Sequence, residues 1–193
     1  NEEILTFHRQ ALDQVAAIPG IQAASFSYGL PYLGLRGTAA FVVEGDRDSK
    51  DGTGTAAKVN AISPDYFEVT GTSVLAGRRF TNADTAQSPT VAIISHSLAQ
   101  RLFPGQDPMG RRVAMAGATP PTWLEIVGVV ADVRSIDVAK PPAPYQVYQT
   151  IAQDPRHTAV LAVRYQGVDQ GAVTAALRSA LNRLDPELQL RDL

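Results

Sequence analysis

The segment from Trp123 to Asp132, WLEIVGVVAD, is the strongest constraint on the fold of this chain. It is almost continuously apolar and β-branched, which is typical of a central strand buried on both faces. Such a strand needs paired neighbours and packed layers on either side. We therefore expect a sheet with a substantial core, and 193 residues are enough for one domain or two small ones.

Other segments have strand-like patterns and can pair with this strand. They are residues 21–28, 38–45, 55–62, 88–94, 111–115 and 157–165. The strand at 55–62 alternates small apolar residues with Lys58 and Asn60, which predicts one buried face and one wet face. Residues 46–54, DRDSKDGTG, predict a solvated hairpin turn, and residues 141–148, PPAPYQVY, predict an extended segment at a sheet edge.

Each end of the chain carries a helix whose apolar residues recur every three or four positions. The first ends at Pro19, and the last runs from its cap, Asp169, to Asp185. A strand is predicted after each helix, the second one at 187–193, so the two ends of the chain have the same order of elements. If a strand also precedes Asn1, each end forms a βαβ or split-βαβ unit.

The stretch ISPDYFEVTG, residues 62–71, predicts a short capped helix. Ser63 is the expected N-cap, a proline follows at the first helical position, and Gly71 ends the helix. Ile62 and Phe67 are expected to pack against each other across the cap as a hydrophobic staple.

A further short helix is predicted with Ser95 as its cap. It runs into QRLFPGQDPMGRRV, residues 100–113. Pro104 prevents the helix from continuing, and Gly110 can adopt a positive φ. This stretch therefore predicts a stiff corner that leads the chain into the next strand.

Composition argues against several functional classes. The net charge of −2 gives no general attraction to nucleic acid or to anionic lipid, and the pairs Arg78-Arg79 and Arg111-Arg112 are predicted to be solvated corners. The absence of cysteine excludes a disulfide framework, a thiolate metal site and a cysteine nucleophile. No apolar run approaches the ~18 residues needed to span a bilayer. Because the chain begins inside a helical pattern and without methionine, we expect it to be a piece of a longer protein.

No candidate for a catalytic residue has the sequence motif or the spacing that catalysis requires. There is no G-x-S-x-G sequence, and His8, His96 and His157 are predicted to be ordinary surface or boundary residues. His96 lies next to Ser95 in the sequence, but neighbouring residues on a helix point to different faces. Glu125 and Asp132 are seven positions apart on one strand and are expected to face opposite ways.

Metal, nucleotide and cofactor sites are not predicted either. The acidic loop beginning at Asp46 lacks the glycine and the glutamate that a calcium loop needs at its sixth and twelfth positions. Lys58 follows glycines but lies in a strand, so it is not a phosphate-loop lysine. The aromatic residues are expected to be core anchors rather than a ligand cage: Tyr66, Phe67, Phe80 and Phe103. We therefore predict no catalytic residue, no cofactor and no metal site.

Five short motifs, in this order and spacing, resemble the extracytoplasmic core domain of MacB-like ABC transporter permeases. They extend over about half of the chain, and the flanks agree with the family only in the order of their elements. The motifs are S-P-D-Y-F (63–67), G-R-x-F (77–80), V-A-I-I (91–94), L-F-P-G-x-D-P-x-G (102–110) and I-V-G-V-V-x-D-V (126–133).

The resemblance implies an α+β fold with a mixed sheet and two lobes. Residues 1–60 and 111–193 are expected to form a discontinuous porter-like lobe of βαβ or split-βαβ units, with a smaller α/β lobe inserted at 61–110. The domain would lie outside the bacterial cytoplasmic membrane, between transmembrane helices of the same parent chain. The implied partners are a second permease copy, a cytoplasmic ATPase subunit or domain, and a periplasmic adaptor, although no long exposed element for binding an adaptor is evident.

The residues and the resemblance leave three functions open. The first is a non-enzymatic domain that couples cytoplasmic ATP hydrolysis to movement outside the membrane, for export or mechanotransmission. The second is a periplasmic ligand-sensing or substrate-capturing module, which requires a concave pocket with convergent polar groups. The third is a hydrolase that uses Ser95 or His96, which requires a Ser–His contact of about 3 Å. We predict the first function.

Overall fold

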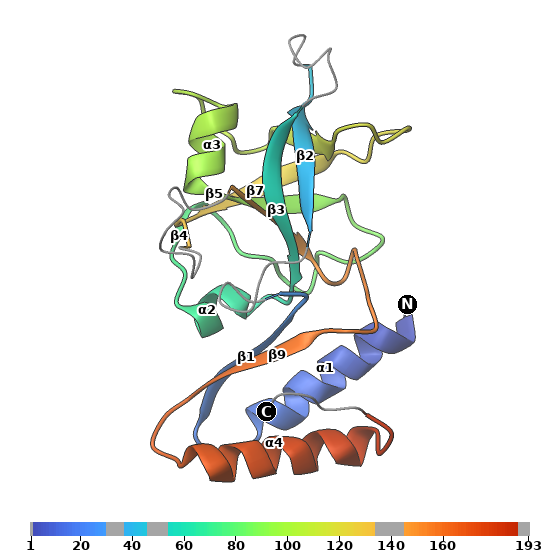
Figure 1. The fold of residues 1–193 in the computed structure, drawn as a ribbon, viewed down its shortest axis with the longest axis vertical. Coiled ribbons are helices and arrows are strands. Elements are labelled where there is room, and N and C mark those ends of the chain that lie inside the picture. The colour runs from blue at the N-terminus through green and yellow to red at the C-terminus, as the bar shows by residue number, and fades with distance from the viewer. Residues whose placement is uncertain (1, 30–36, 46–53, 134–144, 189–193) are drawn as a thin grey trace.

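The computed structural model describes residues 2–29, 37–45, 54–133 and 145–188 (Figure 1). The predicted hairpin turn at 46–54 and the predicted last strand at 187–193 lie almost entirely outside these residues. The helices are α1 (Glu2–Ala16), α2 (Tyr66–Thr70), α3 (His96–Leu102) and α4 (Gln170–Leu184). The strands are β1 (Ile21–Ser27), β2 (Thr38–Val43), β3 (Thr55–Ile62), β4 (Val74–Gly77), β5 (Val91–Ser95), β6 (Arg112–Met115), β7 (Leu124–Val130), β8 (Gln146–Thr150) and β9 (Val160–Tyr165).

All nine strands belong to one mixed sheet, which confirms the predicted α+β class. Six of them close into a barrel in the order β2-β6-β7-β5-β8-β3, because β2 pairs with β3 as well as with β6. The β5–β7 and β3–β8 ladders are parallel, and the other ladders of the barrel are antiparallel. Strand β4 is attached outside this ring, on β7. We call the barrel with β4, α2 and α3 the barrel lobe.

The interior of the barrel is filled by side chains from the strands that the sequence marks as apolar. Its central residues, Phe41, Ile94, Val113 and Ile126, are fully or almost fully buried. All five residues of β5 are buried, and in β7 only Glu125 is exposed, as expected for central strands. Helix α3 packs on the same cluster through Leu98 and Phe103. The core of this lobe therefore comes from strands far apart in the sequence.

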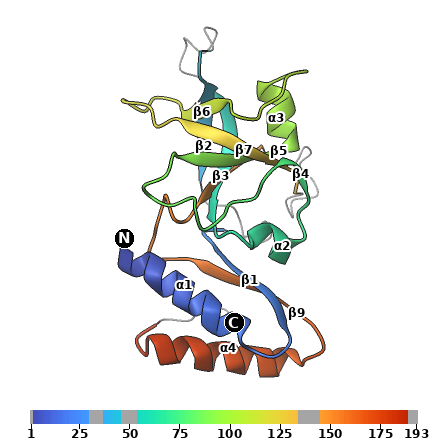
Figure 2. The ribbon, with the colours of Figure 1, turned by 180° about the vertical axis from the view of Figure 1, so that it is seen from behind.

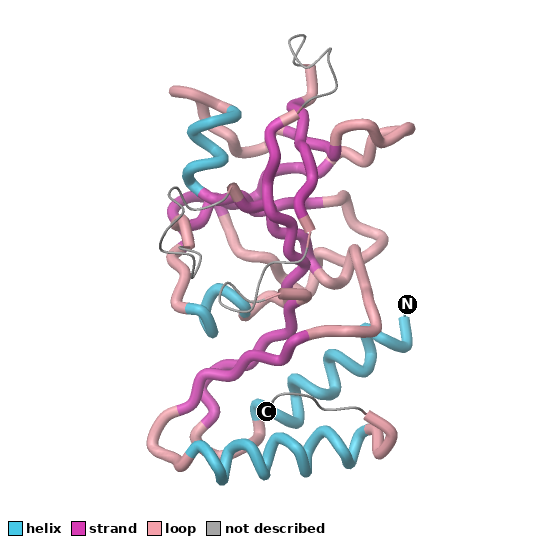
Figure 3. Tube along the Cα trace, viewed as in Figure 1, coloured by secondary structure: helices cyan, strands magenta, loops and turns pink. Residues whose placement is uncertain are grey.

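The remaining two strands, β1 and β9, form an antiparallel ribbon that projects from the barrel lobe (Figure 3). Helices α1 and α4 contact one another and pack on this ribbon, and Figure 2 shows both helices on the same side of it. Their shared core includes Val15, Phe26, Leu177 and Leu181. The Oδ2 atom of Asp169 accepts a bond from Ala172 N at 3.1 Å, so the predicted cap of α4 is confirmed. We call α1, β1, β9 and α4 the helical lobe.

Helix α2 belongs to the barrel lobe and also contacts β1 and β9 of the helical lobe. Tyr66 and Phe67 are buried and pack with Tyr148 and Phe80 of the barrel lobe. The ring centroids of Phe67 and Tyr148 are 5.0 Å apart in an edge-to-face arrangement, which aromatic pairs favour. All four aromatic residues predicted as core anchors, including Phe103, are thus buried.

Three expectations for the strands and for the cap of α2 are wrong. The segment containing β8 is not at an edge, because β8 lies between β5 and β3. The face of β3 that carries Asn60 is not wet, since Asn60 is buried and donates from Nδ2 to Gly29 O at 2.8 Å. Ser63 is not the cap of α2, because the helix begins later, at Tyr66, and the serine hydroxyl bonds elsewhere.

The predicted lobe boundaries remain a prediction, and the packing groups the chain in another way. Phe41 and Ala57, from the predicted porter-like lobe, share a cluster with Ala92 and Ile94, from the predicted inserted lobe. The helical lobe has its own cluster, built mainly from the two ends of the chain and completed by Ala61 and Ile151. The packing therefore places the main division near Tyr28 and the segment 151–159.

The corner at residues 100–113 is built as the sequence predicts. Helix α3 ends directly before Phe103 and Pro104, and Gly110 has a φ of +70°. The amide of Gly110 donates to Ile126 O at 2.9 Å, and the amide of Met109 donates to Asp107 Oδ1 at 3.0 Å. The first bond fixes the corner against β7, and the second closes a turn within the corner.

Candidate functional site

The junction between the two lobes is the candidate functional site. The chain crosses it twice, once after β1 and once between β8 and β9. At the first crossing β1 meets the end of β3, where Ser27 is paired with Ile62. Two backbone bonds extend this pairing: Tyr28 N donates to Ala61 O at 3.0 Å, and Ser63 N donates to Phe26 O at 2.8 Å. The ribbon is therefore a continuation of the barrel sheet.

Side chains reinforce the same crossing. The hydroxyl oxygen of Ser63 accepts a bond from Phe26 N at 2.9 Å, so this motif residue ties α2 to β1 rather than capping α2. Gly29 O accepts bonds from both Ser27 Oγ, at 2.9 Å, and Asn60 Nδ2. Each of these donors or acceptors is buried, and leaving one without its partner costs about 1–3 kcal/mol. These hydrogen bonds hold the crossing, although the Oδ1 atom of Asn60 has no partner among the described residues.

Tyr28 joins the two crossings to one another. Its hydroxyl oxygen accepts a bond from the amide of Arg156, 128 positions further along the chain. The Arg156 guanidinium carbon lies 5.2 Å from the centroid of the Tyr28 ring, and Asp154 Oδ2 holds the guanidinium at 2.8 Å. Burial raises the pKa of Tyr28 to about 12, so the phenol stays neutral at physiological pH.

A second link lies at the end of α2. Arg164 of β9 donates from Nε and Nη2 to Val69 O, at 3.3 and 2.9 Å. This guanidinium satisfies a carbonyl that the helix end would otherwise leave open. Gly71, with a φ of +69°, ends α2 beside it as predicted. The helical lobe is therefore attached to the barrel lobe through α2 as well as through the two chain crossings.

A small crevice of about 170 Å³ opens beside Tyr28. The helical-lobe side is formed by Tyr28 with Asp154 and Arg156 of the second crossing. The barrel side is formed by residues of β2, β3 and β6 and by Gly37, which directly precedes β2. These residues are Gly37, Thr38, Ala39, Val59, Ala61 and Met115. It is the concave feature of the junction that combines polar side chains with an apolar floor.

The family-like motifs meet at a different place, on the outside of β7. Gly77 pairs with Gly128, and a Cβ atom at Gly77 would lie 2.2 Å from Val127 O and 2.7 Å from Met109 Sδ. A Cβ atom at Gly128 would lie 2.4 Å from Arg78 O. Two of the motifs, at 77–80 and 126–133, thus contain a glycine that close packing requires, which gives these two positions a structural role.

The hydrolase candidates are placed in structural roles. Ser95 stands at the N-terminus of α3 as predicted, but its buried hydroxyl accepts a bond from Gln146 N at 3.1 Å instead of capping the helix. Asp132 supplies the cap from the end of β7, accepting from Ser97 N at 3.0 Å and Ser97 Oγ at 2.7 Å. His96 and His157 are exposed, as predicted. The third hypothesis therefore lacks the serine–histidine contact on which it depends.

His8 is the exception among the histidines, because it is buried in the helical lobe. Its ring stacks on Phe26 with centroids 4.5 Å apart, and burial lowers its pKa. The sequence contains the signal for this, since positions 8, 11 and 15 are the buried positions of α1. Its Nδ1 atom has no hydrogen-bond partner among the described residues.

The arginine pairs 78–79 and 111–112 are exposed, as predicted, and one arginine of each pair also contacts a carboxylate at short distance. Arg78 makes a two-pronged contact with Asp84, at 2.7 and 2.8 Å, and this holds the pKa of the carboxyl below its usual value. Arg112 contacts Glu44 from Nε at 2.6 Å. The first contact holds the loop between β4 and β5, and the second joins β6 to the end of β2, so both have a structural role. In the described ranges no cluster of three or more histidine, aspartate or glutamate side chains is arranged to hold a metal ion.

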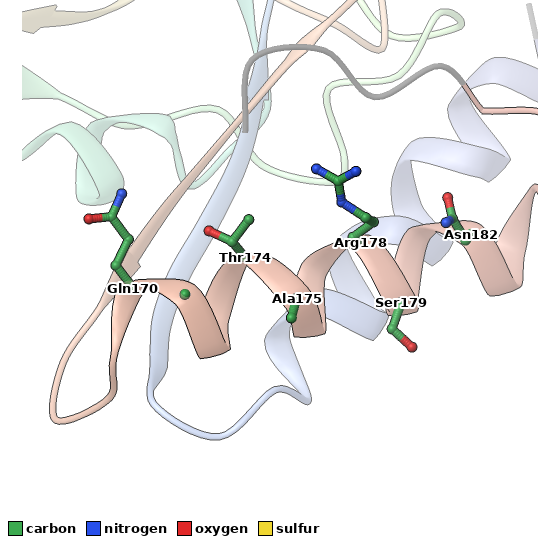
Figure 4. A pocket seen from close by; sticks show the side chains of 7 residues that line it. Gln170, Thr174, Ala175, Arg178, Ser179 and Asn182 are labelled. Atoms are coloured by element: carbon green, nitrogen blue, oxygen red, sulfur yellow. The ribbon is translucent and has the colours of Figure 1, made fainter.

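A second hollow, shallow and about 670 Å³ in volume, lies along α4 (Figure 4). Gln170, Thr174, Arg178 and Asn182 follow one another along one side of the helix at every fourth position. The hollow is open to solvent and borders small side chains, so it offers little enclosure for a ligand.

The whole arrangement matches one family of domains. The family model described as MacB-like periplasmic core domain matches residues 6–182. This chain belongs to that family. The match extends well beyond the five motifs and includes both helices of the helical lobe. The predicted family is therefore confirmed.

Similar curated proteins are components of ABC transporters. A probable syringafactin export ATP-binding/permease protein, SyfD of Pseudomonas syringae, is 34% identical over 97 residues, which cover 49% of this chain and 14% of that protein. An uncharacterized ABC transporter permease, YknZ of Bacillus subtilis, is 31% identical over 99 residues, covering 50% of this chain and 24% of the relative. The matched segments thus span less than a quarter of the length of either relative.

Solved structures share the fold of this MacB-like domain. The periplasmic region of MacB from Actinobacillus actinomycetemcomitans aligns with a TM-score of 0.64 and 17% identity, covering 92% of this chain and 73% of that one. The extracellular domain of the transporter YknZ from Gram-positive bacteria aligns with a TM-score of 0.61 and 18% identity, covering 91% and 82%. Among the described residues, no helix has the length and apolar character required to cross a bilayer.

Proposed function

We propose that this chain is the extracytoplasmic domain of an ABC-type permease of the bacterial cytoplasmic membrane, and that it transmits movement without catalysing a reaction. ATP hydrolysis by a cytoplasmic subunit or domain would move the transmembrane helices of the parent chain. Two permease copies would then move together and apart outside the membrane. The expected partners are these helices, the second copy, the ATPase and, from the family resemblance, a periplasmic adaptor.

The observation that supports this proposal is the construction of the junction. The two chain crossings are bonded to one another through Tyr28 and Arg156, and Arg164 bonds the ribbon to α2. A domain that transmits displacement needs such links, because a joint that yields absorbs the displacement instead of passing it on. Ser95 and Asp132, two of the polar residues discussed as catalytic candidates, are engaged in structural bonds, which is consistent with a non-enzymatic role.

The test uses the intact permease with its ATPase, reconstituted in lipid vesicles. Leu75 is 53% exposed in the barrel lobe, and the chain has no cysteine, so Leu75→Cys gives one spin-label site in each copy of the domain. We expect the distance between the labels in two copies to change when ATP is added. The same measurement with a hydrolysis-deficient ATPase is the control.

A junction variant shows whether the lobes must be linked for this movement. Arg164→Gln removes the contact to Val69 O, and Arg178→Gln, an exposed change on α4, is the matched control. We expect Arg164→Gln to retain ATP hydrolysis but to reduce the ATP-dependent distance change. A label distance that is the same with and without ATP, in an ATPase-active preparation, would contradict the proposal.

The ligand-sensing module remains a second candidate because of one observation, the crevice beside Tyr28. It combines a concave shape with several polar groups, as such a module requires.

A further inference from the structure

We propose that the crevice beside Tyr28 binds a short aliphatic carboxylate, either as a free acid or as the C-terminal residue of a peptide. The inference goes beyond the transmission of movement and does not depend on it. It rests on the kinds of polar group that border the crevice, on its apolar floor and on its size.

The polar groups on the rim are mainly donors. Arg156 uses Nε and Nη2 on Asp154, at 3.4 and 2.8 Å, and its Nη1 has no partner in the described ranges. The Tyr28 oxygen accepts a bond from Arg156 N, so its own proton is available to donate. Thr38, which also lines the crevice, carries a further hydroxyl. A guanidinium with neighbouring hydroxyls is a donor set that suits a carboxylate.

The floor of the crevice determines which group the ligand carries next to its carboxylate. It consists of small or flexible apolar side chains from three strands of the barrel, Ala39, Val59, Ala61 and Met115. Met115 is 38% exposed, and covering it would remove apolar surface from water. The volume of about 170 Å³ is below that of drug-sized pockets and fits a branched chain of a few carbons.

Asp154 limits the affinity. Its carboxylate is paired with Arg156 and borders the same crevice, so it repels an incoming anion while it holds the guanidinium in place. We therefore expect a dissociation constant of about a millimolar, corresponding to roughly 4 kcal/mol of binding free energy. The same reasoning gives a specific expectation: removing the charge of Asp154 strengthens binding.

The experiment is a titration of this chain followed by NMR of ¹³C-labelled methionine methyl groups. The chain has two methionines: Met115 lines the crevice, and Met109 packs near Gly77 and serves as an internal control. Isovalerate is compared with isovaleramide, and the peptide Gly-Gly-Leu with its C-terminal amide. We expect the acids to shift the Met115 signal and to leave Met109 unchanged, and the amides to bind at least fivefold more weakly.

Substitutions in the crevice distinguish binding at this site from weak binding elsewhere on the surface of the chain. Asp154→Asn is expected to lower the dissociation constant severalfold, and Arg156→Gln to raise it at least fivefold. Arg101→Gln, an exposed arginine on α3, is the matched control and should change nothing. Binding of the peptide but not of isovalerate would identify a peptide C-terminus as the source. Equal shifts with acid and amide, or no Met115 shift at 20-fold the expected dissociation constant (about 20 mM), would overturn the proposal.

Discussion

The two lobes differ in how their sheet is completed. In the barrel lobe β2 pairs with both of its neighbours, so the ring of six strands is closed. In the helical lobe β9 pairs only with β1 among the described strands, and its residues 160–163 are half-buried although they are apolar. A two-stranded ribbon has little stability by itself, so this lobe depends on α1 and α4. The barrel lobe is therefore stabilised by the closure of its ring of strands, and the helical lobe by the packing of α1 and α4 on the ribbon.

The substitution with the largest expected effect on the free energy of unfolding lies in the barrel lobe. Gly128→Ala places a Cβ atom 2.4 Å from Arg78 O, a backbone atom that cannot move without shifting β4. We expect a loss of roughly 3 kcal/mol or more in the free energy of unfolding, measured by urea denaturation. Gly105→Ala is the control, because its Cβ atom meets nothing within 4 Å and only its positive φ is strained, at about 1–2 kcal/mol. Similar losses for both variants would show that close packing at β7 is not decisive.

The next effect tests whether the helical lobe opens independently. Leu181→Ala truncates a residue that is 3% exposed between α4 and the ribbon, at a cost of about 2–4 kcal/mol. We expect amide hydrogen exchange to accelerate in α1 and α4, while β5 and β7 keep their protection. If all amides accelerated equally, the two lobes would be one cooperative unit and the comparison would fail.

A smaller effect concerns the barrel lobe's arginine contacts. Arg78→Ala leaves the Asp84 carboxylate, whose side chain is 6% exposed, with Thr81 as its remaining partner, and should cost about 1–2 kcal/mol. Arg79→Ala breaks an exposed contact to Glu68 and should cost less than about 1 kcal/mol. The pKa of Asp84 is lowered from 3.8 by the bond to Arg78. This stabilisation is therefore present above pH 3.8 and is lost as the pH falls through the lowered pKa. Equal losses for the two variants would contradict the structure.

The smallest effect is on the pH dependence of the helical lobe. Burial lowers the pKa of His8 below its ordinary value of 6.5, so below pH 6.5 the unfolded chain takes up a proton that the folded chain does not. Stability should fall on acidification by less than about 1.4 kcal/mol per pH unit. His8→Leu removes this group, and its unfolding free energy between pH 7 and 5 should vary less than that of the parent. An unchanged dependence would mean that the acid sensitivity lies in other groups.

Local patterns predicted the elements but not their partners. The helix ends at Pro19, Gly71 and Asp169, and the buried strand at 91–95, follow from residues within a few positions of each other. The place of β8 inside the sheet does not, because its neighbours β3 and β5 lie far away in the sequence. The same is true of barrel closure, which depends on β2 pairing on both sides.

The junction was not predicted, for the same physical reason. Tyr28 and Arg156 are 128 positions apart, and neither has a local pattern that indicates a contact. Ser63 has the sequence of a cap, but the amide of Phe26 competes for its hydroxyl, and that tertiary contact prevails. The burial of Asn60 likewise depends on Gly29, which follows a different strand.

The parallel ladder between β3 and β8 has a mechanical consequence. Both strands end at the junction, with Ile62 paired with Thr150, and the helical lobe continues from this edge of the barrel. Tension applied through the ribbon would act along β3 and β8. It would load the hydrogen bonds between these two strands together, in shear, instead of breaking them one after another. The domain would resist such tension far better than its two-stranded ribbon suggests.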